Sequence, residues 1–392
     1  MQFNIRGSRR GGGLFGLLLV VGMIVLLFWN EGRSVTRLDT IAAGRDRVVT
    51  ADAGQVDPRN EGGLVHVVGR AEPLEPITDS TFGLTASALK LERTVEMYQW
   101  RETRRTRDDQ TYYEYDRVWS ERPISSSGFH RSGYDNPGTM LWRSRTFYAP
   151  VRLDDFRIGQ PLLERLGGGE RIAPPPPQAQ PPQIRANFRE VGDTLYTGRP
   201  NDPQVGDYRV RFTEVPAQTV TVLARQSNGT LLPYTVEETG GTLAMIEPGD
   251  LTPAAMFDLA VSRNTMMTWG IRLGGTFGMF LGFAMALGSI AAWVPIFRNV
   301  ARGIATLISA VLAVAISVVV IAIGWFWYRP VFSLVLIGAA IAALIGLRVF
   351  LRRREPAQAP PQPAYAGGPP PAPPPAGSAN MPPPPPPPRS EA

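Results

Sequence analysis

Cysteine is absent from the 392 residues, and only two histidines and one lysine occur. Without cysteine there is no disulfide and no zinc site built on thiolates, so an exported domain must be stabilised by its own core. His66 and His130 are too few for a histidine-rich metal site, and we expect them in strands or at the surface. We predict no metal and no cofactor.

Charge is absent from four long stretches, residues 14–29, 273–297, 303–328 and 331–347, which together contain 84 residues. Runs of about 18–25 apolar residues match the thickness of a bilayer core, so these stretches exclude a soluble protein confined to one compartment. Proton relays and ion pathways usually keep ionisable groups inside the membrane. A coupled transporter is therefore disfavoured.

The net charge of +6 would ordinarily suggest a nucleic-acid partner. However, residues 31–272 hold 29 basic and 32 acidic residues, whereas the remaining segments hold 11 and 2, so the excess lies beside the apolar stretches. If four helices cross in series, all the arginines at their ends except Arg329 share one side with the termini. This asymmetry predicts both termini in the cytoplasm, residues 31–272 outside and no nucleic-acid partner.

We predict an α+β membrane protein with four transmembrane helices, one N-terminal and three C-terminal, and a large, mainly β extracytoplasmic domain between the first and second. The first stretch is interpreted as an uncleaved anchor, because Asn30–Arg33 follows it without a small-residue cleavage pattern. The predicted segments are a cytoplasmic N-terminus (1–13), the first span (14–29), the β-rich domain (30–252) with a proline-rich insertion (173–183), a juxtamembrane helix (253–272), further spans (273–297, 303–328 and 331–351) and a disordered proline-rich cytoplasmic tail (352–392).

Alternating apolar residues predict strands in the central region. Leu89–Trp100 places Leu89, Leu91, Val95 and Met97 on one face, and we expect it to pair with Tyr112–Ser120 across a polar loop, Arg104–Gln110. A second hairpin is expected from Asp207–Val215 and Gln218–Gln226, joined across Pro216-Ala217. Leu231–Val236 and Thr242–Glu247 would continue it, and Thr252-Pro253 is a helix-start signal.

Two proline tracts interrupt these patterns. Pro174–Pro177 with Pro181-Pro182 is interpreted as a surface loop of polyproline character, and Pro356–Pro388 as an extended cytoplasmic arm. The arm is either a passive low-complexity tail or a ligand for a partner that binds proline motifs.

Motifs for catalysis are missing, since the sequence has no Gly-rich phosphate loop, nucleophile elbow or paired His-carboxylate motif. Glu92, Glu96 and Glu102 are better explained by a solvated sheet face. We therefore predict that the protein is not an enzyme. Small residues are frequent in 273–297 and 303–328, and they indicate either helix packing within the chain or oligomerisation.

Seven motifs resemble the LUMA family, transmembrane protein 43: NEGR (30–33), NEGGLVH (60–66), KLERTVEMYQW (90–100), VTVLARQ (220–226), NTMMTWGIR (264–272), WVPIFR (293–298) and GWFWYRP (324–330). The proline insertion and the tail depart from the family. Within the motifs, the positions predicted to be structural or to make interactions are Asn30, Glu31, Gly32, Arg33, Asn60, Glu61, Gly62, His66, Glu96, Met97, Tyr98, Gln99, Trp100, Trp269, Gly270, Tyr328, Arg329 and Pro330.

The resemblance implies one anchor, a large lumenal or extracytoplasmic domain, three C-terminal spans and no catalytic residues. Animal members are associated with the inner nuclear membrane and endoplasmic reticulum as scaffolds that self-associate and contact emerin and lamins. The near absence of lysine, with abundant Ala, Gly, Pro and Val, favours a bacterial member, to which those partners do not transfer. For a bacterial member we expect the protein in the cytoplasmic membrane, with its large domain in the periplasm.

The predicted function is a non-enzymatic membrane scaffold that forms homo-oligomers in the lipid bilayer and organises other membrane or envelope proteins. The alternatives are a channel or channel-associated protein, and an extracytoplasmic sensor. A conducting path needs a polar lining, and the spans offer only scattered hydroxyl groups such as Thr276, Ser309 and Ser317.

Overall fold

The computed structural model describes residues 8–107, 110–291 and 298–353 together with Gly368. Of the predicted N-terminal segment 1–13, the structure describes only Ser8 onward. The end of the second apolar stretch (292–297) and nearly all of the proline-rich tail lie outside the described residues. The chain divides into two units, Met1–Ser333 and Leu334–Ala392, and the elements described below belong to the first unless stated.

Three described helices are long and apolar enough to cross a membrane: Gly12–Arg45, Pro253–Ser289 and Gly303–Tyr328. They belong to α1 (Ser8–Arg45), α4 (Pro253–Ala291) and α5 (Arg298–Tyr328). The fourth predicted span falls in α6 (Pro330–Arg353), whose apolar part, Ser333–Gly346, is shorter than the about 20 residues that a bilayer core requires. That span remains a prediction.

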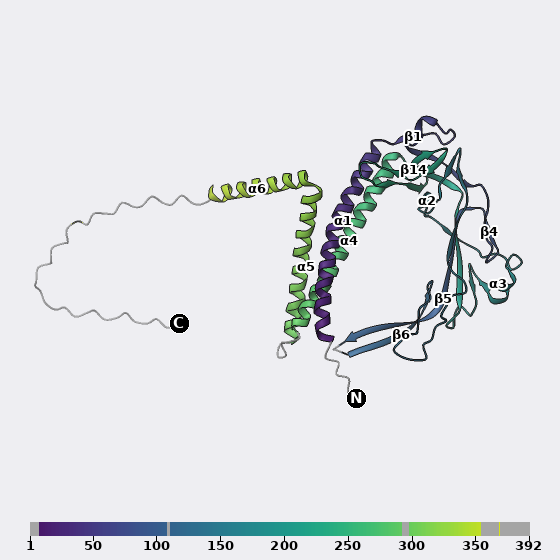
Figure 1. The fold of residues 1–392 in the computed structure, drawn as a ribbon, viewed down its shortest axis with the longest axis horizontal. Coiled ribbons are helices and arrows are strands. Elements are labelled where there is room, and N and C mark those ends of the chain that lie inside the picture. The colour runs from purple at the N-terminus through teal and green to yellow at the C-terminus, as the bar shows by residue number, and fades with distance from the viewer. Residues whose placement is uncertain (1–7, 108–109, 292–297, 354–367, 369–392) are drawn as a thin grey trace, which may run out of the picture. The chain divides into compact units, whose positions relative to one another are not determined.

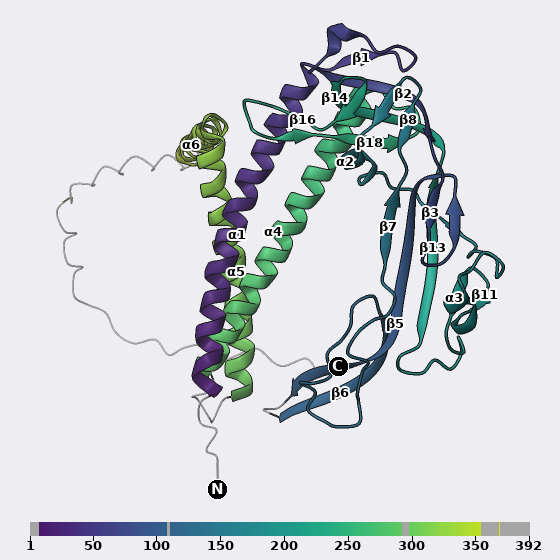
Figure 2. The ribbon, with the colours of Figure 1, turned by 45° about the vertical axis from the view of Figure 1, so that its right-hand side comes forward.

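The helices α1 and α4 extend well beyond their apolar stretches and run side by side (Figures 1 and 2). The expectation that the β-rich domain starts at residue 30 is wrong, because α1 continues to Arg45 and the first strand begins at Val49. The buried Ile41 explains this extension, since it packs with Leu64 of the β-rich region and Phe257 of α4. The Thr252-Pro253 signal is confirmed as the start of α4.

Glycines set the distance between α1 and α4 in their apolar halves. A Cβ on Gly282 would lie 2.7 Å from the Gly16 carbonyl oxygen, and one on Gly275 would lie 2.7 Å from a Leu27 methyl carbon. Small residues allow such close backbone approach, which substitutes in lipid for a hydrophobic driving force. These glycines therefore serve packing within the chain.

The β-rich region contains two seven-stranded sheets. In the first, the pairings run from β2 through β8, β9, β15 and β14 and return to β2, with β1 and β18 added. Its strands are β1 (Val49–Ala51), β2 (Leu64–Pro73), β8 (Val151–Leu153), β9 (Phe156–Ile158), β14 (Gln218–Ser227), β15 (Thr230–Leu232) and β18 (Met245–Pro248).

The second sheet has the order β11-β12-β13-β5-β6, with β10 paired to β13 and β7 to β5 (Figure 2). Its strands are β5 (Ala88–Arg107), β6 (Gln110–Ser120), β7 (Arg145–Tyr148), β10 (Glu170–Ile172), β11 (Arg189–Val191), β12 (Thr194–Tyr196) and β13 (Tyr208–Pro216). Shorter elements are η1 (Pro58–Asn60), α2 (Gln160–Leu163), α3 (Pro182–Asn187) and the pairs β3 (Ile77–Asp79) with β4 (Leu84–Ala86) and β16 (Tyr234–Thr235) with β17 (Thr242–Leu243).

The alternation predicted for Leu89–Trp100 is confirmed. Leu89, Leu91, Val95 and Met97 are all fully buried in the main core. The pairing with the following strand is also confirmed, but the predicted loop 104–110 is wrong, since the ladder continues to Arg107 opposite Gln110. Cross-strand charge pairs explain why this polar stretch is strand: Arg105 Nε lies 2.6 Å from Glu114 Oε2.

The predicted hairpin of β13 with β14 is wrong. β13 pairs with β5, Tyr208 opposite Met97, while β14 pairs with β2, Val222 opposite Val67. A two-residue hairpin turn needs positive φ, which proline cannot adopt, so Pro216-Ala217 instead carries the chain from one sheet into the other.

The proline insertion is also more than a surface loop. Pro174 and Pro175 are buried, and Pro182 begins α3, from which Ile184 enters the main core. A buried hydrogen bond from Gln180 Nε2 to the Pro175 carbonyl, 2.7 Å, holds the segment folded. The polyproline composition did not reveal that this segment packs.

Candidate functional site

A buried polar cluster joins α1, α4 and α5 at the ends of their apolar stretches. At its centre, the Glu31 side chain is only 2% exposed and forms a two-pronged ion pair with Arg272, with distances of 2.8 Å from Nε to Oε1 and 2.6 Å from Nη2 to Oε2. The indole Nε1 of Trp325 donates to Glu31 Oε2 at 3.0 Å. One carboxylate therefore ties together three helices.

The next turn of α1 adds a second layer to this cluster. Arg33 donates to Asn264 Oδ1 at 3.1 Å, to Asn30 Oδ1 at 3.2 Å and to Thr268 Oγ1 at 3.0 Å. Asn264 in turn donates to the Ser34 carbonyl at 3.1 Å. These neutral amide and hydroxyl groups hold the guanidinium of Arg33 in the seam between α1 and α4.

Two glycines make room for the cluster. A Cβ on Gly32 would lie 2.5 Å from the Tyr328 ring, and one on Gly324 would lie 2.8 Å from the Glu31 side chain. The Arg272 guanidinium also lies 5.0 Å from the centre of the Trp269 ring, a contact of the cation–π type. Aromatic side chains thus shield the ion pair.

The chemistry of this arrangement is structural. Breaking a buried ion pair costs several kcal/mol, because the remaining charge is left uncompensated, while an intact pair mainly fixes how its elements meet. The Glu31 oxygens already accept three charged or N–H donors, which leaves them poorly placed to act as a base. The described residues contain no group of three His, Asp or Glu side chains able to hold a metal ion.

The predicted positions Asn60, Glu61, Gly62 and His66 lie in the β-rich region. Glu61 accepts from the Asn228 amide at 3.0 Å, and Gly62 has a φ of +77°, which favours glycine. His66 is buried on β2, and its Nε2 lies 2.8 Å from the Leu251 carbonyl oxygen just before α4. His66 thus links β2 to the segment before α4, whereas Glu61 holds the turn between β14 and β15.

The VEMYQW positions lie on β5. Glu96 forms ion pairs with Arg209 at 2.6 Å and with Arg211, both on β13, and Met97 is in the core. Gln99 is buried and accepts from the Ile124 amide at 2.7 Å. Trp100 is half-buried, with its ring centre 4.9 Å from that of Tyr134, and Tyr98 packs against Trp119. These contacts hold the second sheet and its loops.

The structure therefore brings Asn30–Arg33, Trp269 and Tyr328 together and leaves the other predicted positions apart from them. A Cβ on Gly270 would meet open space, the Arg329 amide donates to the Trp325 carbonyl at 2.8 Å, and Pro330 begins α6. Our predicted set lacked Asn264, Thr268, Arg272 and Trp325. Three of these occur in NTMMTWGIR and one in GWFWYRP. A carboxylate and an arginine just outside two apolar stretches were the available signal.

A model of the transmembrane protein 43 family matches residues 97–330. The chain is 31% identical to human transmembrane protein 43 over 372 residues, which cover 88% of this chain and 92% of the human protein. It is 32% identical to the protein of Pongo abelii with the same coverage, and 25% identical to the Drosophila melanogaster homologue over 83% of this chain and 92% of that protein. The chain is thus a membrane protein that belongs to the transmembrane protein 43 family.

Proposed function

We propose that this protein is a non-enzymatic membrane scaffold that self-associates and presents its β-rich region to other membrane or envelope proteins. The observation that carries this proposal is the continuity of α1 and α4, which run from the membrane into the β-rich region and are clamped by the Glu31–Arg272 pair. A rigid connection keeps a large folded surface at a fixed orientation to the bilayer, which suits holding partners.

The orientation we propose is the one the arginine asymmetry predicts, with both termini in the cytoplasm and residues 31–272 on the opposite side. In a bacterium the β-rich region would then be periplasmic. Cysteine labelling tests this, because the chain has no native cysteine. A cysteine introduced at Ser126 should react in intact spheroplasts. Reaction only after the membrane is opened would contradict the orientation.

Self-association has a candidate surface on α4. Gly270 and Gly274 are separated by one helical turn, and a Cβ on either would meet nothing within 4 Å, so this small-residue pair is left open. Pairs of this spacing allow helices of two chains to approach closely. The hydroxyls of Thr276 and Ser317 bond to each other at 3.0 Å and Ser309 bonds to its own helix, which supports a scaffold rather than a channel.

The deciding experiment is the mass of the purified protein in detergent, measured by light scattering. We expect an oligomer for the natural chain and a smaller species for Gly270→Leu/Gly274→Leu. Gly288→Leu is the matched control, because Gly288 is also open but lies further along α4. A monomeric natural chain, or protein-dependent ion flux in liposomes, would contradict the proposed function.

A further inference from the structure

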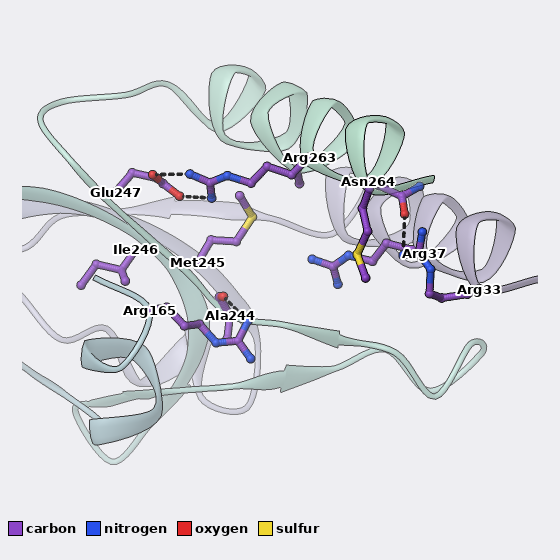
Figure 3. Close-up of a pocket in the computed structure, with 11 residues that line it drawn as sticks. Arg33, Arg37, Arg165, Ala244, Met245, Ile246, Glu247, Arg263 and Asn264 are labelled. Atoms are coloured by element: carbon purple, nitrogen blue, oxygen red, sulfur yellow. Dashed lines mark hydrogen bonds and ion pairs between the residues drawn. The ribbon is translucent and has the colours of Figure 1, made fainter. Parts of the chain in front are cut away.

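A basic cleft of about 310 Å³ lies between α1, α4 and the β-rich region, beside the polar cluster (Figure 3). Arg33 and Arg37 enter it from α1, Arg165 from the segment after α2, and Arg263 from α4. Its one acidic residue, Glu247, is paired with Arg263, whose Nη2 lies 2.8 Å from Glu247 Oε2. The lining therefore carries an excess of positive charge.

Three of these arginines form no ion pair with any residue that the structure describes. Arg37 donates to the Thr242 carbonyl at 2.7 Å, Arg165 to the Ala244 carbonyl at 3.1 Å, and Arg33 to amide and hydroxyl oxygens. Because a guanidinium has five N–H donors, each retains donors for an added anion.

The depth of the cleft points to the headgroup layer of the membrane. Arg33 and Arg37 lie four and eight residues beyond Trp29, which is about 6 and 12 Å along a helix rising about 1.5 Å per residue. The headgroup layer on each side of a bilayer is roughly 5–8 Å thick, given a core of about 30 Å within about 40–45 Å in total. Arg33 therefore falls within this layer, and Arg37 lies beyond its outer edge, where the cleft would receive a phosphate that projects from the layer. Met267, which lines the cleft, is 53% exposed, and Trp269, two residues further along α4, is 55% exposed, as expected at a membrane interface.

We propose that this cleft binds the phosphate group of an anionic phospholipid, with Arg37 and Arg165 as its main donors and Arg33 at its inner end. Arginine is suited to phosphate because its planar fork can donate two parallel hydrogen bonds to adjacent oxygens. The rest of the lining is largely apolar, including Ala244, Met245 and Ala260. That part suits the glycerol and upper acyl carbons of a lipid and has no role for free phosphate.

The test uses the full chain in neutral detergent and its thermal unfolding midpoint with added phosphatidylglycerol, phosphatidylcholine or inorganic phosphate. Phosphatidylglycerol alone should raise the midpoint of the natural chain. Arg37→Gln/Arg165→Gln should weaken the apparent affinity by about tenfold for each arginine removed, the usual effect of a charged hydrogen bond. Arg157→Gln/Arg225→Gln, which removes two exposed arginines outside the cleft, should respond like the natural chain.

If both lipids raised the midpoint equally, or if the double variant responded to phosphatidylglycerol as strongly as the natural chain, the cleft would not be an anionic-lipid site. If inorganic phosphate raised the midpoint as much as phosphatidylglycerol does, the ligand of the cleft would be free phosphate and not a lipid. If the double variant does not fold, Arg37→Gln alone carries the same comparison. The inference is independent of self-association, because a monomer would still contain the whole cleft.

Discussion

In the β-rich region large apolar side chains such as Phe82, Phe156 and Phe212 fill the core, which also contains the buried ion pair of Arg93 with Asp79. The helices α1, α4 and α5 share only a small apolar cluster, and they meet through close glycine contacts and the Glu31–Arg272 ion pair. The difference follows from the solvent around each part. In water, burying apolar surface stabilises the fold at about 25 cal/mol per Å². In lipid that gain disappears, so the helices depend on close packing and on polar groups that have no other partner.

The largest expected effect tests the apolar core of the β-rich region. Phe212 is fully buried, with its ring centre 5.8 Å from that of Phe82. Phe212→Ala should cost about 3–5 kcal/mol, because it leaves a cavity. Trp100 is only half-buried, so Trp100→Ala should cost less. Chemical unfolding followed by circular dichroism measures both, and equal losses would contradict the assigned core.

The next largest effect tests the buried ion pair between the helices. Glu31→Ala should cost about 3 kcal/mol, since it strands the Arg272 charge between helices. Glu31→Leu/Arg272→Met should restore much of that loss by removing both charges. Amide hydrogen exchange of α1, α4 and α5 gives the measurement, with the β-rich region as internal control. Exchange that is unchanged in Glu31→Ala would show that the pair does not hold the helices.

A smaller effect tests close packing. Gly282→Leu should cost about 1–3 kcal/mol through overpacking against Gly16. Gly274→Leu is the matched control within one helix, because its Cβ points into open space, and it should leave the stability of a single chain unchanged. Thermal unfolding of the two variants under conditions that keep the protein monomeric separates them. The reverse order would contradict the seam between α1 and α4.

The smallest effect concerns acid. Burial raises the pKa of Glu96, but the hydrogen bonds and charges of Arg209 and Arg211 outweigh it and lower the pKa below its usual value. A carboxyl group with a lowered pKa contributes stability above its unfolded pKa of about 4.3, and this is lost as pH falls through the folded value. Glu96→Gln should therefore flatten the acid side of the stability profile of the β-rich region. If the natural chain and Glu96→Gln had identical stability profiles in acid, Glu96 would not be the group that causes the acid dependence.

The sequence by itself determined the elements whose signals are local. Charge-free stretches predicted the three long apolar helices, alternation predicted the buried face of β5, and Thr252-Pro253 predicted the start of α4, because each signal depends on the residues within it. Motifs also singled out Asn30–Arg33, Trp269 and Tyr328, but not that these residues meet.

Only the tertiary structure decided which elements meet. The sequence could not show that β13 and β14 enter different sheets, that the proline insertion packs, or that Arg272 and Trp325 converge on Glu31 across 241 and 294 residues. It likewise gave no sign of the cleft, since Arg37 and Arg165 are 128 positions apart along the chain. Pairing and burial depend on contacts between distant residues, and a local pattern carries no information about which distant partner will satisfy it.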